Sequence, residues 1–448
     1  MDPFRQGEKQ AETATSQERS KSMSGQRLEA AIVGGGIGGL SLAQGLRKAG
    51  VRVAVYERDE TPTSRLQGYR VHIDPQGSTA LHQCLPEHLW EIFDATEGDY
   101  SEGITLITEQ LEELLRLRGD ADVADPIARH RSISRITLRH VLLAGIQDAV
   151  HFNRRFVSYE ELPDGRFAIH FEDGSSAEAD VVVAADGVNS RVRKQYLPDA
   201  EPIDTGVVTL GGKIPLTDGV MALAPHRLLD GPVMVMPPEA CSLFMAIWKR
   251  SAEANRSLKL LGMDEPPEGD EDYMILGLGG EPGYFGLPGD PDSMTARALK
   301  EALRKAVARW HPDLRKLVEM VSENEISVNR LRTSRPMAPW KTSGITLLGD
   351  AIHSMTPYRG IGANIALKDA ALLAAKLIEA DCGEKPLLEA IAEYETSMRA
   401  YAFAAVESSR KSMEQAVGEK KYPIFGIAKT AMRVVNAVPF LRKKLISA

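Results

Sequence analysis

The sequence contains little cysteine, no excess of positive charge and no long apolar run. Its three cysteines, Cys84, Cys241 and Cys382, lie far apart in the 448 residues and form no CxxC pair. This spacing excludes a disulfide framework, a cysteine zinc site and a dithiol redox centre, and it favours a reducing, cytoplasmic environment. The net charge of -8 argues against a nucleic-acid binder, because neutralising phosphates requires a basic surface. No apolar run reaches the length needed to cross a bilayer, so we expect a small-molecule partner.

The order of apolar, glycine-rich and helical segments predicts a mixed α/β (α+β) chain. Residues 1–27 are polar and contain no apolar segment, which predicts a disordered leader. From Leu28, an apolar run, a glycine turn, a helical stretch and a second apolar run predict strand, helix, strand. The predicted parts are a Rossmann-like nucleotide-binding domain over 28–200 with a return segment at 336–380, an inserted β-sheet domain at 201–335, and C-terminal helices over 381–448.

Shorter patterns predict individual elements. The turn Pro163-Asp164-Gly165 separates two strand-like runs and predicts a hairpin. Predicted strands are 156–162, 166–171, 180–185, 206–214, 233–236, 242–249, 273–278 and 345–348. Predicted helices are 136–146, 361–380 and 387–415.

The first motif is a glycine-rich turn between the first strand and its helix. Gly34, Gly36 and Gly39 form a GxGxxG pattern. The first glycine permits a tight turn, the second lets the backbone approach a pyrophosphate, and the third allows close helix packing, while the helix N-terminus offers N–H groups to phosphates. Glu57 ends the second strand, near the spacing of an acid that binds an adenosine ribose. The pattern predicts dinucleotide binding; a structural glycine turn is the alternative.

The second motif follows the strand at 180–185, where Asp186 and Gly187 form a turn. Parallel α/β sheets place ligand-contacting groups at the carboxyl ends of their strands. The alternative is an ordinary Asp-Gly turn capped by Asn189 or Ser190.

The third motif follows the strand at 345–348. That strand delivers Asp350 to a crevice, where its carboxylate could accept hydrogen bonds from a polyol chain such as ribityl. Gly360 and Gly362 then open a helix whose N-terminal N–H groups point at the same crevice. His353 has no second ligand at helical spacing, so no metal site is predicted.

These three motifs, in this order and at these separations, closely resemble the signature of the class A flavin monooxygenases. That family includes para-hydroxybenzoate hydroxylase, polyketide hydroxylases and the tetracycline-inactivating monooxygenases. The resemblance spans about Leu28 to Ala380 and implies an FAD-binding domain with an inserted substrate domain. It also implies tightly bound, non-covalent FAD and a transient NAD(P)H, because no second GxGxxG follows.

The resemblance assigns cofactor contacts residue by residue. It implies that the GxGxxG binds the ADP half, with Glu57 on the ribose and Arg58 beside the adenosine. Asp350 would contact the ribityl chain, and 357–364 would lie beside the isoalloxazine ring. A helix-surface salt bridge is the alternative for Arg135. The implied cofactor-binding residues are Gly34, Gly36, Gly39, Glu57, Arg58, Arg135, Asp186, Gly187, Asp350, Gly360, Gly362 and Asn364.

The same resemblance implies the reaction of a monooxygenase. NAD(P)H would reduce FAD, O2 would add to the reduced flavin at C4a, and the hydroperoxide would pass one oxygen atom to a small aromatic or polyketide-like substrate. Candidate catalytic residues are Pro357, Arg70 and His72, because the family brings the segment from Gly68 to His72 close to the flavin. Ordinary packing is the alternative for Arg70 and His72.

Substrate-facing side chains are expected from the inserted sheet. Phe244, Met245 and Trp248 are the candidates, although apolar residues that alternate along a strand more often form a core. An FAD-dependent dehydrogenase or reductase of the same fold would share every motif without inserting oxygen. A nicotinamide-only dehydrogenase would share the first motif alone, and a non-catalytic FAD module would not oxidise NAD(P)H. The sequence is compatible with a monomer or a homodimer.

The C-terminal stretch from Lys420 to Ala448 is basic and amphipathic. It contains no acidic residue and seven basic ones, and its apolar residues recur with helical spacing. This pattern predicts a helix that contacts either an anionic membrane surface or the body of the enzyme.

Overall fold

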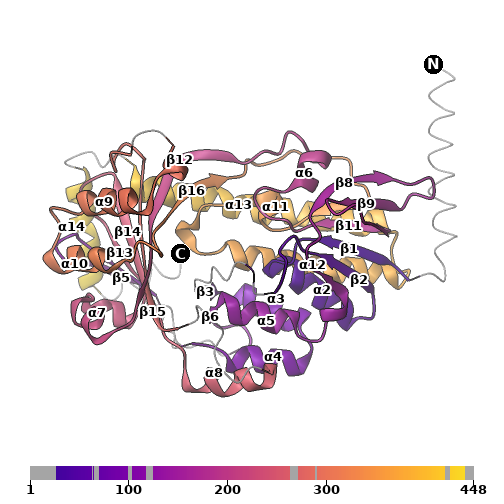
Figure 1. Ribbon diagram of the computed structural model, residues 1–448, viewed down its shortest axis with the longest axis horizontal. Helices are drawn as coiled ribbons and strands as arrows, with labels where there is room; N and C mark the ends of the chain where they lie inside the picture. Colours follow the sequence, from indigo (N-terminus) through magenta and orange to yellow (C-terminus); the bar gives the residue numbers. More distant parts are fainter. Residues whose placement is uncertain are drawn as a thin grey trace.

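The computed structural model divides the chain into an α/β region and a sheet-based region that lie side by side (Figure 1). The predicted leader falls outside the described residues except for Arg27. The structure describes residues 27–62, 64, 70–98, 103–117, 125–262, 271–287, 290–418 and 424–438.

The first region is built on a five-stranded parallel sheet with the order β17-β11-β1-β2-β7. Both faces are covered, so β11 consists entirely of buried apolar residues, as strands of parallel sheets usually do. The predicted strand, helix, strand at the start of this region is confirmed. The strands are β1 (Glu29–Val33), β2 (Arg52–Tyr56), β7 (Val150–His151), β11 (Val181–Ala184) and β17 (Ile345–Leu347).

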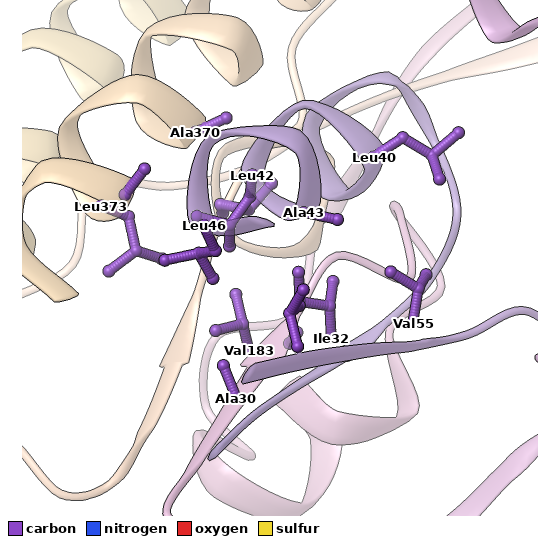
Figure 2. Packing of buried hydrophobic residues seen from close by; sticks show 14 of the residues in the cluster. Ala30, Ile32, Leu40, Leu42, Ala43, Leu46, Val55, Val183, Ala370 and Leu373 are labelled. Atoms are coloured by element: carbon purple, nitrogen blue, oxygen red, sulfur yellow. The ribbon is translucent and has the colours of Figure 1, made fainter. Parts of the chain in front are cut away.

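Helices α2 and α12 pack on one another and cover this sheet. Figure 2 shows Leu42 and Leu46 of α2 directed toward Leu373 of α12 and toward Val183 of the sheet, and all four side chains are fully buried. The helix predicted over 136–146 is α5, and Ser134 caps it because its side chain accepts the Ile136 and Thr137 N–H groups. The helices are α2 (Ile37–Lys48), α3 (Pro75–Cys84), α4 (Glu87–Ala95), α5 (Arg135–Leu143), α6 (Arg191–Tyr196), α11 (Asp350–His353) and α12 (Gly362–Asp381).

The second region is built on a seven-stranded sheet with the order β16-β12-β15-β14-β13-β4-β5. The segment 201–335 supplies five of its strands, but β4 and β5 come from earlier in the chain. β4 joins the sheet because it pairs in parallel with β13, Thr105 opposite Val233. The strands are β4 (Ile104–Ile107), β5 (Glu113–Leu117), β12 (Ile203–Pro215), β13 (Val233–Val235), β14 (Cys241–Trp248), β15 (Tyr273–Gly280) and β16 (Ser327–Thr333).

Short helices cover the second sheet, and two small sheets complete the first region. The predicted hairpin around Gly165 is confirmed as the antiparallel pair β8 and β9. The remaining strands are β3 (Arg70–Ile73), β6 (Arg131–Ser134), β8 (Phe156–Glu161), β9 (Phe167–Phe171) and β10 (Ser176–Ala179). The remaining helices of this part are α7 (Asp218–Leu223), α8 (Ala252–Ser257), α9 (Ala296–Ala306) and α10 (Pro312–Met320).

Two C-terminal helices link the regions. α13 (Leu387–Val417) packs along α12, and Met413 at its far end joins a small apolar cluster with Val207 and Leu331 of the second sheet. α14 (Ile424–Ala437) lies on β5. Within the described part of the chain, no helix combines the length and apolar character of a membrane span.

The contact between α2 and α12 is expected to be a main source of stability. Leu46→Ala should lower the free energy of unfolding by about 2–5 kcal/mol, because it leaves a cavity between packed elements. Urea unfolding followed by circular dichroism measures this loss. Leu260 is 69% exposed, so Leu260→Ala is the matched control and should change stability by less than about 0.5 kcal/mol. Equal effects of the two substitutions would contradict the packing argument.

Candidate functional site

One large cavity joins the carboxyl ends of the first sheet to the second sheet. Its volume is about 2040 Å³. Single small-molecule pockets are commonly about 300–1,000 Å³, so this cavity has room for two ligands placed end to end. Its lining runs from the turn after β1, past α5 and the loop before α12, to β14 and β15.

The glycine turn after β1 combines packing requirements with open space. Gly34 has a φ of +112°, and a Cβ built there would lie 2.3 Å from the Ala185 carbonyl oxygen. A Cβ on Gly39 would lie 2.2 Å from the Gly34 carbonyl oxygen. A Cβ on Gly36 would meet no protein atom within 4 Å. Gly34 and Gly39 are therefore required by packing, whereas Gly36 leaves space in the cavity where α2 begins.

Glu57 and Arg58 line the cavity next to this turn. Glu57 is buried, and its Oε2 accepts the Gly35 N–H at 2.7 Å while its Oε1 accepts the Asp59 N–H at 2.9 Å. The carboxylate thus braces the glycine turn from the end of β2. Arg58 is exposed at the cavity rim.

Asp186 and Gly187 line the cavity at the end of β11. Asp186 Oδ2 accepts the Arg191 N–H at 2.8 Å at the start of α6, and the Ser190 side chain caps the same helix. Burial raises the pKa of Asp186. Its Oδ1 is buried and has no hydrogen-bond partner in the described chain. One carboxylate oxygen thus serves the turn, and the other is free for a ligand.

Asp350 and Arg135 face one another across the cavity. Asp350 follows Gly349 at the end of β17, and among the described residues its carboxylate accepts no hydrogen bond. Burial raises the pKa of Asp350, and the charges of His353 and Arg135 oppose that shift. Arg135 begins α5, and its enclosure lowers its pKa. The alternative of a surface salt bridge does not hold for Arg135, which forms none within the described ranges.

Behind Asp350 lies a buried ion pair. His353 Nε2 is 2.5 Å from Asp369 Oδ2, which also accepts the Gly349 N–H at 2.8 Å. The Tyr401 hydroxyl donates to Asp369 Oδ1 at 2.6 Å. Burial alone would lower the pKa of His353, but the Asp369 carboxylate and its hydrogen bond raise it overall. Asp369 therefore ties α12, α13 and the Asp350 turn together.

The loop before α12 also borders the cavity. Pro357, Gly360 and Gly362 line it, and α12 begins at Gly362 without a side-chain cap, so its first N–H groups are available to a ligand. Asn364 departs from expectation, because it is buried and does not line the cavity. Its Oδ1 accepts the Asp74 N–H at 3.0 Å, and its Nδ2 donates to the His72 carbonyl at 2.9 Å. The Asn364 side chain is thus used to position His72 and does not face the cavity, while the predicted cofactor contact of this residue stays a prediction.

Arg70 and His72 lie on β3 at the junction of the two regions, and both line the cavity. His72 Nε2 is 3.2 Å from His130 Nδ1, and the two rings stack. Burial, followed by the charges of Arg70 and His130, lowers the pKa of His72 to about 4. His72 is therefore neutral near pH 7. Gly68 and Tyr69 of the same segment lie outside the described residues.

The predicted substrate-facing residues divide between cavity and core. Phe244 lines the cavity. Met245 is 0% exposed and belongs to the core of the second sheet, because it points to the opposite face of β14. Trp248 is 1% exposed and packs against Gly98, where a Cβ would lie 2.2 Å from its ring. For Met245 and Trp248 the alternative of core packing therefore holds, and neither faces the cavity.

The cavity lining also includes residues that the sequence analysis did not assign, among them His130 and Arg139, and it includes Tyr358 from the predicted ring-contacting range 357–364. The sequence does contain a pattern that could have identified Arg139: it lies four residues after Arg135, so both side chains are on the same face of the helix. His130 belongs to no recognisable pattern. Burial raises the pKa of Tyr358 to about 12, and a Cβ on Gly279 would lie 2.1 Å from its hydroxyl. Tyr358 therefore connects the loop before α12 to β15.

Two family descriptions match parts of the chain. A "NAD(P)-binding Rossmann-like domain" matches residues 32–96, and an "FAD binding domain" matches residues 288–409. A crystal structure named as an FAD-containing monooxygenase from Photorhabdus luminescens is 36% identical, with a TM-score of 0.76, and the match covers 87% of this chain and 98% of that one.

Some characterised proteins of similar sequence are about twice as long as this chain, and others are of comparable length. The dual O-methyltransferase/FAD-dependent monooxygenase of Cercospora beticola is 29% identical over 87% of this chain and 46% of its own length. 6-Hydroxynicotinate 3-monooxygenase of Pseudomonas fluorescens is 27% identical over 83% of this chain and 88% of its own length. The chain spans about half the length of the first curated relatives it matches.

The His353–Asp369 pair should make stability depend on pH. Asp369→Asn should lower the free energy of unfolding by about 3–5 kcal/mol near pH 6, because it breaks a buried ion pair. A His with a raised pKa stabilises the fold fully below its unfolded pKa of about 6.5, and that contribution is lost as the pH rises through the folded pKa. The deficit of the variant should therefore shrink in alkaline buffer, as measured by urea unfolding across the pH range.

Glu395 offers a matched control for this prediction. It is also a buried carboxylate on α13, but the Thr342 and Thr346 hydroxyls donate to it. Glu395→Gln should destabilise the protein without that alkaline recovery. A deficit of Asp369→Asn that stays constant with pH would contradict a charged His353.

Proposed function

Because the chain belongs to the FAD-dependent monooxygenases of the class A, aromatic-hydroxylase type, we propose that it uses NAD(P)H and O2 to insert one oxygen atom into a small aromatic or polyketide-like substrate. The observation that carries this proposal is the large cavity that runs without interruption from the glycine turn to the second sheet. One ligand can occupy the end at the first sheet, and a second can reach it from the end at β14 and β15.

The first end of the cavity fits FAD. The open space at Gly36 and the N-terminus of α2 suit a diphosphate, with Glu57 and Arg58 at the adenosine. Asp350 and Arg135 offer an unsatisfied acceptor and a cation for the ribityl chain and the phosphates. Pro357, Gly360 and Gly362 would border the ring, and Asp186 would hold the loop at the end of β11.

When bound, FAD supplies the redox chemistry and the activation of oxygen. The N–H groups at the start of α12 would favour negative charge on the ring of the reduced cofactor. The enclosed walls of the second sheet would keep water from the reacting atoms. NAD(P)H would enter and leave in each turnover, because the chain offers only one glycine-rich dinucleotide turn.

The second end of the cavity fits an uncharged or weakly acidic aromatic substrate. Phe244 and Met234 supply an apolar surface there. The acidic residues of the cavity lining, Glu57, Asp59, Asp186 and Asp350, all belong to the first region. Arg70 would attract a phenolate, and the neutral His72, within hydrogen-bond distance of His130, would hydrogen-bond a phenolic hydroxyl.

The C-terminal helix α14 offers a second contact surface. Its inner face lies on β5, where Arg433 Nη2 is 2.5 Å from Glu112 Oε2. Its outer face exposes Ile427 by 66% and Val434 by 53%. Basic residues flank the helix in the sequence on both sides, although Lys420, Lys421 and 442–444 lie outside the described residues. We propose that this face contacts an anionic membrane surface.

A glycine substitution tests the cofactor site. Gly36→Val should fold normally, because a Cβ there meets no protein atom, yet it should lose at least about 90% of bound FAD because the side chain fills the space for the diphosphate. Asp350→Ala should also lose FAD. Absorbance at the flavin bands per mole of purified protein measures occupancy. Gly283 is likewise free of contacts, so Gly283→Val is the control, and full occupancy in both site variants would overturn the assignment.

Isotope labelling tests the reaction. Incubation with NADPH or NADH, a panel of phenols and ¹⁸O2 should yield a product that carries one ¹⁸O atom, detected by mass spectrometry. A product formed equally well without O2 would instead identify an FAD-dependent dehydrogenase of the same fold. A wild-type protein that cannot be loaded with FAD would overturn the proposed function itself.

Vesicle sedimentation tests the membrane contact. The full chain should sediment with phosphatidylserine vesicles and not with phosphatidylcholine vesicles. Val434→Asp should weaken binding several-fold, whereas Val157→Asp, at a residue 49% exposed on β8, should not. Equal binding by both variants would exclude α14 as the contact.

A further inference from the structure

Arg139 is a second arginine of α5 whose side chain lines the cavity. It lies on α5 four residues after Arg135, and both side chains line the cavity. Four residues of α-helix rise by about 6 Å. The two cations are therefore spaced along the cavity, Arg135 opposite Asp350 and Arg139 beside the end of β2.

The guanidinium of Arg139 lacks the hydrogen bonds that a buried charge requires. Its Nε and Nη2 atoms are buried, and neither has a hydrogen-bond partner in the described chain. Buried charges in folded proteins are almost always paired and hydrogen-bonded, and an exception points to a ligand or an ion. The side chain itself is only 21% exposed, so bulk water does not account for both atoms.

The neighbouring Asp59 compensates the charge of Arg139 but does not supply the missing hydrogen bonds. Arg139 Nη1 is 3.6 Å from Asp59 Oδ2, which is longer than a hydrogen bond. That contact involves a different nitrogen from the two unpaired ones. The ion pair with Asp59 therefore involves only Nη1, and the N–H groups of Nε and Nη2 remain without a hydrogen-bond acceptor.

From this geometry we infer that Arg139 binds the ADP half of a dinucleotide as a second arginine of α5. The unpaired N–H groups match phosphate oxygens, for which an arginine fork is well suited. The position beside Glu57, Asp59 and the glycine turn matches the adenosine side of the dinucleotide site, whereas Arg135 and Asp350 lie on its ribityl side. The inference rests on the proposed function, because it needs a dinucleotide in this cavity.

Binding of FAD and of ADP to the full chain, freed of bound flavin, tests the inference without any measurement of activity. Arg139→Ala should raise the Kd of both FAD and ADP by about tenfold, because both ligands carry the diphosphate. Riboflavin lacks that half and should bind the variant as it binds the wild type. Isothermal calorimetry measures all three ligands.

Two further variants keep the result interpretable. Arg139→Lys keeps the charge but loses the fork, so it should fold even if Arg139→Ala does not, and it should raise the Kd of ADP about threefold. Arg47→Ala removes the same charge outside the cavity, where Arg47 pairs with Asp148 at 2.6 Å. That control should leave the ADP Kd within about twofold of the wild type.

The outcomes separate this inference from the proposed function. A wild type that binds FAD and ADP, with Arg139→Ala and Arg139→Lys within twofold of it, would overturn the role of Arg139 alone. Equal losses of riboflavin and FAD affinity would place Arg139 at the flavin half and overturn it as well. A wild type that binds neither FAD nor ADP would overturn both statements.

Discussion

The close approach of the turn after β1 to the end of β11 is the constraint on which the site depends. Gly34 lies so near the Ala185 carbonyl that no side chain fits between them. The chain continues from β1 to β2 on one side of the sheet, and β11 pairs with β1 on the other. A parallel sheet opens a crevice where its connections diverge in this way. The glycine turn, Glu57 and Asp186 are brought together at that crevice.

Compensation of charge behind the cavity is the second organising feature. Asp350 faces the cavity, while Asp369 is buried behind it and accepts from Gly349, His353 and Tyr401. The fully buried Asp369 carboxylate is tolerable only beside a cation, which His353 supplies, whereas the Asp350 carboxylate is open to the cavity and faces Arg135. Tyr401 of the long helix α13 donates a hydrogen bond to Asp369. Because Asp369 also binds the Gly349 N–H, the Asp350 turn is connected to a helix that contacts the second sheet at its other end.

Local patterns revealed the nucleotide-binding half of the site and much less of the substrate half. Gly34, Gly36 and Asp350 belong to short motifs in which each residue type has a local physical reason. His130 and Tyr358 enter the cavity only because β6 pairs with β3 and because Gly279 allows the approach of a phenol ring. Asn364 lies within a motif, yet its amide is used by the chain itself. A motif identifies the residue but not the direction of its side chain.

The sequence by itself determined the fold class, the α2 turn, the main strands and the chemistry expected at the carboxyl ends of the first sheet, because these depend on residues close together in the chain. The tertiary structure decided the rest. It brought β4 and β5 into the second sheet, turned Met245 and Trp248 into the core, and left two nitrogens of Arg139 unpaired in the cavity. Such outcomes depend on pairing and packing between segments distant in sequence, which local periodicity does not encode.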